Sequence, residues 1–246
     1  ADNSLIMGHR LSEWTGHGPM LEQDIAISNI ALDLVGQSRN FYQYAALLIN
    51  QSTNQPINNA TEDSLAYLRE ANDFKNILLV ELPNGDWAKT ILKLFFFSTY
   101  QFYLYQKLMD SSDKQLSAIA EKSLKEVTYH VRWSSEWVIR LGDGTPESKH
   151  RIENALNELW SYTNEMFEPA DYETGCAKNK IGVDVTSLQN DWNKKVKEVF
   201  EEATIVSPPR EEVRSGLGKQ GNHTEHLEEI LNDMQYLQRT YPGCEW

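Results

Sequence analysis

The chain has 246 residues, of which 40% are hydrophobic and 24% charged, and its formal net charge is −13. This composition is typical of a globular protein, and we expect a single domain over residues 1–246. The acidic balance argues against nonspecific nucleic-acid binding, which needs surfaces rich in Lys and Arg, and no apolar run is long enough to cross a membrane.

Gly, Pro and polar breaks divide the chain into helical segments. The apolar spacing predicts helices over residues 4–15, 19–50, 61–82, 87–109, 114–141, 146–167, 184–203 and 224–238. Residues 168–183 read as irregular, and only 181–185 shows a weak strand-like alternation. Because short connections join antiparallel neighbours in bundles, we predict an all-α fold with a four-helix core and additional helices.

The segment 19–50 carries apolar residues on two faces of its predicted helix. One stripe consists of Leu21, Ile25, Ser28 and Leu32, and the other of Ile27, Ile30, Leu34, Gln37, Phe41, Ala45 and Leu48. A helix that is apolar on both sides is typical of burial between neighbours, so we expect both stripes to be covered.

Two of the predicted helices begin with strong local signals. Thr61 is a suitable N-cap and is followed by acidic residues, which the positive end of a helix favours. Thr145 is a second N-cap candidate, and Pro146 occupies the first helical position, where proline costs no hydrogen bond.

Cysteine usage and the start of the chain both bear on the cellular compartment. The chain has two cysteines, Cys176 and Cys244, without ligand-like spacing. Such sparse cysteines are typical of free thiols in a reducing compartment. No signal-peptide pattern opens the chain, so we expect a cytoplasmic protein that does not associate with membranes.

The helix predicted over 114–141 places a histidine on its apolar face. His130 lies on that face three residues after Val127. Carboxylate di-iron bundles carry a Glu and a His at this spacing on inward-facing helices. The segment therefore has the histidine of such a pair without its glutamate.

Other inner positions lack carboxylates as well. Leu34 and Gln37 have the same spacing on the helix over 19–50, and Ser98 lies at mid-length of the helix over 87–109. Leu and Val carry no ligand atom, and one His with a Gln and a Ser supplies too few hard oxygen ligands for a di-iron centre. We therefore expect no metal in this chain and a core His130 hydrogen-bonded to a neighbour such as Gln37.

Two further pairs have ligand-like spacing but a simpler interpretation. Glu147 and His150 open a helix, where a carboxylate complements the helix dipole. Glu70 and Asp73 lie beside Arg69 and lack a nearby histidine, so we expect them to form a solvated or partly buried ion-pair network.

A loop over 214–221, containing Gly and Lys, precedes the last predicted helix, whose start holds His223. Backbone N–H groups at a helix start, together with Arg214 and Lys219, could hold a phosphate or a carboxylate. We favour instead a loop that docks the terminal helix or contacts a partner.

Five segments together resemble one known family. They are residues 8–14, 32–41, 81–86, 125–130 and 221–227. Over essentially its whole length the chain is similar to the PaaC family, the C subunits of the bacterial ring 1,2-phenylacetyl-CoA epoxidases. The resemblance implies a ferritin-like fold and a related catalytic subunit that carries a di-iron site. It also implies that Glu-x-x-His pairs of that relative occupy the places of Leu34-x-x-Gln37 and Val127-x-x-His130, with a carboxylate at Ser98.

What the resemblance implies for function is a non-catalytic structural subunit of the phenylacetyl-CoA monooxygenase. Its partners would be the catalytic di-iron subunit, the other small subunit and the reductase of the complex, and it would hold no cofactor itself. Two alternatives are an active di-iron oxygenase and a ferritin-like metal-binding protein. Both require inward carboxylates, which the inner stripes lack.

Aromatic positions off the inner stripes are candidates for partner contact. They are Phe41, Tyr42, Tyr44, Phe95, Phe96, Phe102 and Tyr103. Because two-sided helices exceed what one four-helix core needs, we expect a face of the helices over 19–50 and 87–109 to dock on the catalytic subunit. The basic residues Arg214 and Lys219, with His223, are further candidate contacts.

Overall fold

The computed structural model describes residues 1–52, 60–209, 218–242 and 244. They fall into two compact units, unit 1 with Ala1–Pro83 and Leu217–Trp246, and unit 2 with Asn84–Gly216. All regular elements in these described ranges are helical, so the all-α prediction is confirmed. Residues 181–185, despite their weak strand-like alternation, form no strand. The single domain over residues 1–246 stays a prediction. None of the described helices is long and apolar enough to span a membrane.

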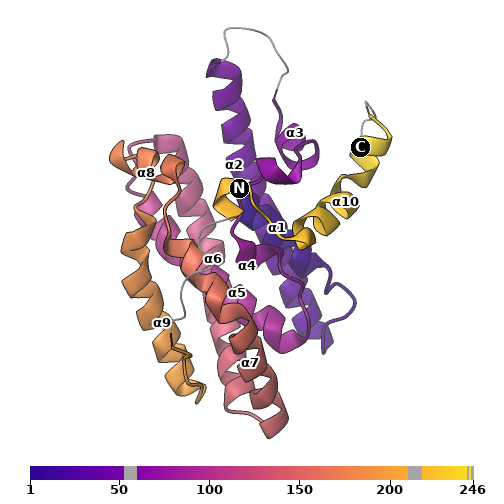
Figure 1. Cartoon of the computed structure of the whole chain (residues 1–246), viewed down its shortest axis with the longest axis vertical. Coiled ribbons are helices and arrows are strands. Elements are labelled where there is room, and N and C mark those ends of the chain that lie inside the picture. The colour runs from indigo at the N-terminus through magenta and orange to yellow at the C-terminus, as the bar shows by residue number, and fades with distance from the viewer. Residues whose placement is uncertain (53–59, 210–217, 243, 245–246) are drawn as a thin grey trace. The chain divides into compact units, whose positions relative to one another are not determined.

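Unit 1 is built around the long helix α2 (Figure 1). Its elements are α1 (Asp2–Ser12), α2 (Leu21–Ser52), α3 (Glu62–Tyr67), the short 3-10 turn η1 (Ala71–Asp73), α4 (Leu78–Glu81), the turn η4 (Gly218–Gln220) and α10 (Glu225–Thr240). Helix α1 packs closely on α2 at Gly8, where a Cβ atom would lie 3.0 Å from Val35 Cγ2 and 3.2 Å from Ala31 O. Helix α10 contacts α1, α3 and α4, so the chain's end returns to its beginning.

The continuous helix predicted over 61–82 is wrong. The helix α3 covers only 6 residues, and an extended stretch separates η1 from α4. In that stretch the backbone N–H of Lys75 donates to Asp2 Oδ2 at 2.7 Å, and that of Ile77 donates to Asn3 Oδ1 at 2.8 Å. Because side chains of α1 satisfy these donors, the segment forms no helical hydrogen bonds here.

Unit 2 contains the three helices that run side by side in Figure 1 as α5, α6 and α7. Its elements are α5 (Trp87–Leu108), α6 (Lys114–Gly142), α7 (Pro146–Leu159), the 3-10 segment η2 (Trp160–Phe167), α8 (Asp171–Lys178), the turn η3 (Val185–Leu188) and α9 (Gln189–Glu202). The core is an aromatic cluster of Phe95, Phe96, Trp160, Trp192 and Phe200. The indole N–H of Trp192 donates to Phe96 O at 3.0 Å, so this buried polar group is satisfied.

The predicted helix caps at Thr61 and Thr145 are confirmed. Thr61 Oγ1 accepts from Ser64 N at 3.0 Å. Thr145 Oγ1 accepts from Ser148 N at 3.2 Å, and Pro146 stands at the start of α7. In both caps the serine side chain also accepts from the backbone N–H of the cap residue, which closes a reciprocal pair.

Two predictions for the middle of unit 2 are wrong. The helix expected over 146–167 changes after Leu159 to the 3-10 geometry of η2. The segment 168–183, expected to be irregular, contains α8, whose first turn is held by the Ala170 N–H donating to Glu173 Oε2 at 2.9 Å. None of the α8 residues is buried, so the helix has no apolar stripe that could reveal it in the sequence.

Candidate functional site

Four exposed apolar side chains lie on one face along the first half of α2. Leu21 is 69% exposed, Ile25 52%, Leu32 69% and Val35 37%. Ser28 stands between Ile25 and Leu32, and we call these five residues the α2 stripe. Their spacing of four, three, four and three residues is that of a seam along which two helices pack. Contiguous exposed apolar surface of this kind marks interaction sites.

The second predicted stripe of α2 is buried only over its first part, because Leu48 near the helix end is 45% exposed. Ile27, Ile30 and Leu34 are fully buried, and Gln37 is 1% exposed. The expectation that both apolar faces of this helix are covered is therefore wrong for the α2 stripe. The spacing of the stripe is visible in the sequence. A covered stripe and an exposed stripe have the same spacing, however, so the sequence could not predict that this one is exposed.

The predicted metal-related positions of unit 2 lie on α5 and α6. Ser98, Val127 and His130 are all fully buried. Ser98 Oγ is 3.4 Å from Ser134 Oγ, and the Ser134 hydroxyl donates to His130 O at 2.7 Å. A short chain of hydroxyl contacts thus links Ser98 of α5 to the His130 turn of α6. The expected hydrogen bond from His130 to Gln37 of unit 1 stays a prediction.

The side chains at these positions do not fit a carboxylate di-iron centre. Leu34 and Val127 present only carbon atoms, and Gln37, Ser98 and His130 together contain no carboxylate. Such a centre is held by several Glu or Asp oxygens and two histidines. Across the described residues, no three His, Cys, Asp or Glu side chains gather closely enough to hold a metal ion.

Tyr42 is engaged inside unit 1 rather than offered as a contact. It is 5% exposed, and its hydroxyl donates to Asp2 Oδ1 at 2.6 Å. Arg69 Nη2 lies 2.7 Å from the same carboxylate oxygen and 2.8 Å from the Tyr42 hydroxyl. A charge at position 42 would disrupt this network, so the predicted use of Tyr42 as a docking residue is wrong.

Lys219 and His223, also expected as partner contacts, are buried. Lys219 is 3% exposed, and the His223 side chain is 3% exposed. The start of α10, considered as a phosphate or carboxylate site, already receives an internal anion, because the Thr224 N–H donates to Glu81 Oε1 at 2.7 Å. Arg214 lies outside the described residues.

The remaining aromatic candidates divide into buried and accessible groups. Phe95 and Phe96 are fully buried in the core of unit 2, so their expected place on a docking face is wrong. Phe41 and Tyr103 are partly exposed. Tyr103 lines an open groove of about 490 Å³ between α5, α6 and α9, and its role as a contact stays a prediction.

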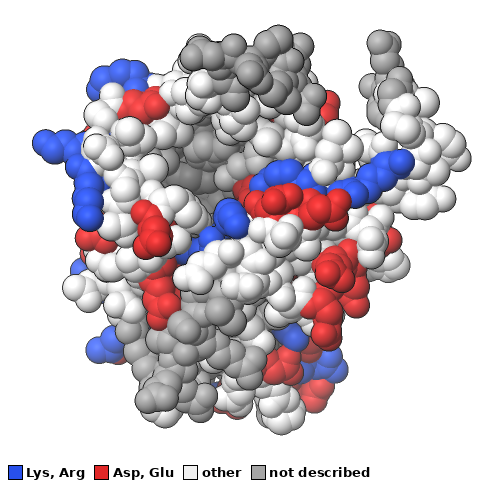
Figure 2. All heavy atoms as spheres, turned by 45° about the horizontal axis from the view of Figure 1, so that its top comes forward, with Lys and Arg blue, Asp and Glu red and all other residues white. Residues whose placement is uncertain are grey.

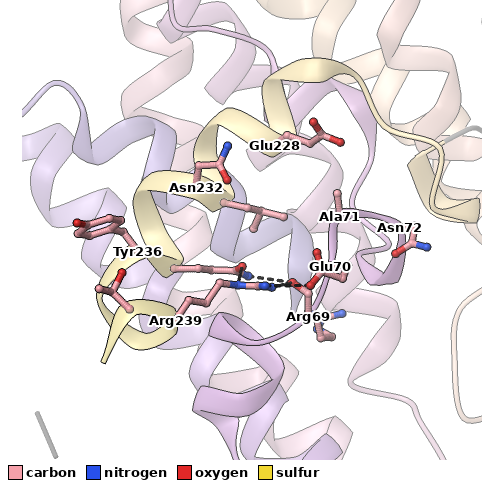
Figure 3. A pocket seen from close by; sticks show the side chains of 11 residues that line it. Arg69, Glu70, Ala71, Asn72, Glu228, Asn232, Tyr236 and Arg239 are labelled. Atoms are coloured by element: carbon pink, nitrogen blue, oxygen red, sulfur yellow. Dashed lines mark hydrogen bonds and ion pairs between the residues drawn. The ribbon is translucent and has the colours of Figure 1, made fainter. Parts of the chain in front are cut away.

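An open pocket of about 440 Å³ lies in unit 1 beside α10 (Figure 3). Arg239 Nη1 pairs with Glu70 Oε1 at 2.9 Å, and its Nε and Nη2 donate to Gln235 Oε1 at 2.7 Å and Arg69 O at 3.0 Å. The Arg69 guanidinium pairs with Asp2 at 2.7 Å. Both guanidinium groups are thus engaged within the unit. Arg69 and Glu70 do form ion pairs, but with Asp2 and Arg239, so the network expected among Arg69, Glu70 and Asp73 is wrong in its partners. We interpret the pocket as a seam that anchors α10.

On the face drawn in Figure 2, charges of both signs are mixed. Among the described residues drawn in Figure 2, Lys and Arg side chains are interspersed with Asp and Glu and form no continuous basic field. This mixed surface agrees with the net charge of −13.

Comparison with known proteins decides the family. Residues 1–246 match the PaaA_PaaC family model, described as phenylacetic acid catabolic protein. The chain belongs to this family. Over 245 residues it is 43% identical to the C subunit of the 1,2-phenylacetyl-CoA epoxidase of Escherichia coli (strain K12), a match that covers 100% of the chain and 95% of that relative.

The PaaA_PaaC match confirms the resemblance seen in the sequence. Members of this family are ferritin-like and helical, which agrees with the helices of both units. The relative's name describes it as one subunit of an epoxidase. Membership therefore places the chain among proteins of phenylacetate catabolism.

Proposed function

We propose that the chain is the non-catalytic structural subunit of a phenylacetyl-CoA monooxygenase, a ring 1,2-epoxidase of aerobic phenylacetate catabolism. Its similarity over the full chain to an epoxidase subunit supports the assignment to such a complex. The observation that carries the non-catalytic role is the chemistry of Leu34 and Val127. Both are buried hydrocarbon side chains where the resemblance implies glutamates. Iron-dependent oxygen chemistry would then belong to the partner.

The proposal includes the rest of the complex. The catalytic subunit holds the di-iron centre, while the other small subunit and the reductase complete the assembly. This chain supports the catalytic subunit and holds no cofactor of its own. The complex works in the cytoplasm, where acyl-CoA substrates are made and consumed.

The α2 stripe is the surface that we assign to the catalytic subunit. Leu21, Ile25, Leu32 and Val35 recur at the spacing of a helix-packing seam, so the expected occupant is a helix of the catalytic subunit with an apolar stripe of its own. Burial of four large apolar side chains is a strong driving force. An obligate interface of this kind covers more than about 2,000 Å² in total.

Iron content separates the proposal from its two alternatives. The purified chain is loaded with Fe(II), desalted and measured by elemental analysis. We expect no stoichiometric iron because the inner positions lack carboxylates. About two irons per chain would contradict the proposal. Turnover of phenylacetyl-CoA by the loaded chain would then identify an oxygenase, and its absence a metal-binding protein.

Reconstitution tests the structural role itself. The catalytic subunit is assayed for phenylacetyl-CoA turnover with the remaining components, with and without this chain. We expect the two subunits to co-elute and turnover to depend on the chain. Failure of the chain to bind the catalytic subunit would overturn the proposed function.

A further inference from the structure

The C-terminal helix of unit 1 is joined to the N-terminal part by a buried acid–histidine pair. His223 Nδ1 is 2.9 Å from Glu81 Oε2, and His223 Nε2 is 3.0 Å from Phe74 O. The side chain of Glu81 is fully buried and that of His223 is 3% exposed. These contacts connect the segment just before α10 with α4 and with the extended stretch that precedes α4.

Both nitrogens of the His223 ring face oxygen acceptors. A neutral imidazole carries a proton on only one nitrogen, and its other nitrogen is an acceptor. A backbone carbonyl cannot donate, so Nε2 must carry a proton toward Phe74 O. The contact between Nδ1 and Glu81 then needs a second proton, because a bare nitrogen and an ionised carboxylate would repel each other.

We propose that the shared proton of Glu81 and His223 holds the start of α10 against α4. We call this protonated pair the latch. Two further N–H donors point at the Glu81 carboxylate, so we place the shared proton on the imidazole. Asn76 Nδ2 donates to Glu81 Oε2 at 2.9 Å, and the Thr224 N–H donates to Oε1 at 2.7 Å. The pair is thus an imidazolium and a carboxylate, out of water and hydrogen-bonded on every side, which is the condition under which buried charges are tolerated.

The direction of the pH dependence follows from this arrangement. The folded geometry favours the protonated ring, so its stabilising contribution is present while the proton is bound and is lost as pH rises. Loss of the proton leaves the Glu81 charge buried opposite a neutral nitrogen lone pair. The Glu81 carboxylate also accepts the N–H of Thr224, the N-cap residue of α10, so a displaced Glu81 side chain would no longer hold the start of this helix.

Other charged groups on the neighbouring elements also contribute to the electrostatic environment of the Glu81–His223 pair. Among the described residues they include His9 and Arg10 of α1, Glu13 just after it, Lys75 before α4, Lys219 of η4, and Glu225 and His226 at the start of α10. Arg10 donates through Nε and Nη2 to Glu81 O at 3.0 and 2.8 Å, which holds the backbone rather than the carboxylate. Arg10 also pairs with Glu13 at 2.8 Å. His226 pairs with Glu229 at 3.2 Å, and the His226 side chain is 28% exposed.

The His226–Glu229 pair provides a matched control. It lies three residues further along the chain and also joins a histidine Nδ1 to a glutamate Oε2, but it is accessible to water. Replacing this histidine tests whether any histidine–glutamate pair at the start of α10 accounts for the effect, or only the buried one.

The first experiment needs no substitution. Ring nitrogen resonances of the six histidines are recorded by ¹⁵N NMR on the full chain across pH. The His223 signals are assigned as those missing from the spectrum of the H223Q variant. If H223Q does not fold, selective labelling makes the assignment. We expect both His223 nitrogens to carry protons at about pH 7, where an unperturbed imidazole is mostly neutral. An unprotonated nitrogen on His223 at that pH would overturn the latch.

The second experiment measures the consequence for α10. Hydrogen exchange, corrected for the intrinsic rate at each pH, is compared at about pH 7 and about pH 9. We expect protection of the α10 amides to fall by about tenfold or more at the higher pH, while α5 and α6 keep theirs. The H223Q variant should have low α10 protection at both values, and H226Q should behave as wild type. Unchanged protection of α10 in the wild type at high pH, or loss of its pH dependence in H226Q, would refute the proposal.

Discussion

Asp2 and Arg69 are both largely buried in unit 1, where they form an ion pair with each other. Burial alone would raise the pKa of the Asp2 carboxyl, but the hydrogen bond and charge of Arg69 outweigh it and hold that pKa below its ordinary value. Burial, and then the neighbouring Asp2 charge, raises the pKa of Tyr42 far above its ordinary value, so its hydroxyl stays a donor. The three side chains therefore act as one unit, and removing one takes a hydrogen-bond partner from each of the other two.

The Asp2–Arg69 pair should make unit 1 sensitive to acid. Because the folded-state pKa of Asp2 is lowered, the pair stabilises the fold above the unfolded carboxyl pKa of about 3.9, and the contribution is lost as pH falls through the lower folded value. We expect Asp2→Asn to lower the free energy of unfolding at neutral pH by about 1–3 kcal/mol. The free energy of unfolding, measured with urea across the acid range, should also depend less on pH in the variant than in the wild type.

The control for this prediction is the exposed pair of Arg39 and Glu62. Their atoms are 3.4 Å apart, and the side chains are 68% and 29% exposed. Glu62→Gln should cause little measurable change, because water screens such pairs. An equal loss in both variants would show that burial of the Asp2 network contributes nothing special.

His130 should be structural. Its ring is fully buried in α6 of unit 2, within a helix turn that also accepts the Ser134 hydroxyl. We expect His130→Ala to lower the free energy of unfolding by about 1–3 kcal/mol, because it removes a buried polar ring and leaves its neighbours unsatisfied. Denaturant midpoints and turnover of the reconstituted complex are compared. Abolished turnover at unchanged stability would contradict a structural role.

At the scale of elements, two helix contacts of this chain lie at glycines, Gly8 and Gly142. Gly142 ends α6 against the end of α9, where a Cβ would lie 2.3 Å from Ala203 O and 2.9 Å from Ala203 Cβ. Neither atom belongs to a flexible side-chain end, so the backbone would have to move. Gly36 of α2 lies in open space instead, because a Cβ atom there would have no neighbouring atom within 4 Å.

These two glycines predict opposite effects of one substitution. Gly142→Ala should lower the free energy of unfolding by about 1–3 kcal/mol, because it overpacks the contact between α6 and α9. Gly36→Ala should raise it by up to about 1 kcal/mol, because alanine is the better helix former and space is open. Thermal and urea unfolding of the isolated chain measure both. A stable Gly142→Ala variant would mean that the two helix ends separate without cost.

At the scale of the whole molecule, the α2 stripe is the feature that needs a partner. Exposed Leu and Ile at a helix-packing spacing reduce solubility unless they are covered, and a protein within a complex is covered by its neighbour. Unit 2 also has an exposed apolar side chain at Val206, which is 86% exposed, but it belongs to no helix and no stripe.

A charge on the stripe should weaken assembly without unfolding the chain. We expect Leu32→Glu to raise the Kd for the catalytic subunit by about tenfold or more, because it buries an unpaired charge in the interface. Val206→Glu makes the same chemical change at an exposed site outside the stripe and should leave the Kd unchanged. Analytical ultracentrifugation of the mixed subunits measures both, and circular dichroism checks the fold. Native affinity in Leu32→Glu would place the interface elsewhere.

Most helix positions could be read from the sequence alone, and so could the absence of carboxylates at the inner positions Leu34, Gln37, Ser98 and Val127. Caps at Thr61 and Thr145 act over three residues, and Leu34 and Val127 cannot bind a metal in any fold. Family membership was likewise visible in short motifs. These properties depend on residue identity and on neighbours within one helical turn, which a sequence states directly.

Only the tertiary structure decided what covers each helix and where distant groups meet. The helix expected over 61–82 is broken because Asp2 and Asn3 take its backbone donors, and the α2 stripe is exposed although it matches the buried pattern. The contact of Glu81 with His223 joins residues 142 positions apart. Hydrogen bonds and burial of this kind are set by packing between segments that are distant in the chain, and local periodicity contains no information about them.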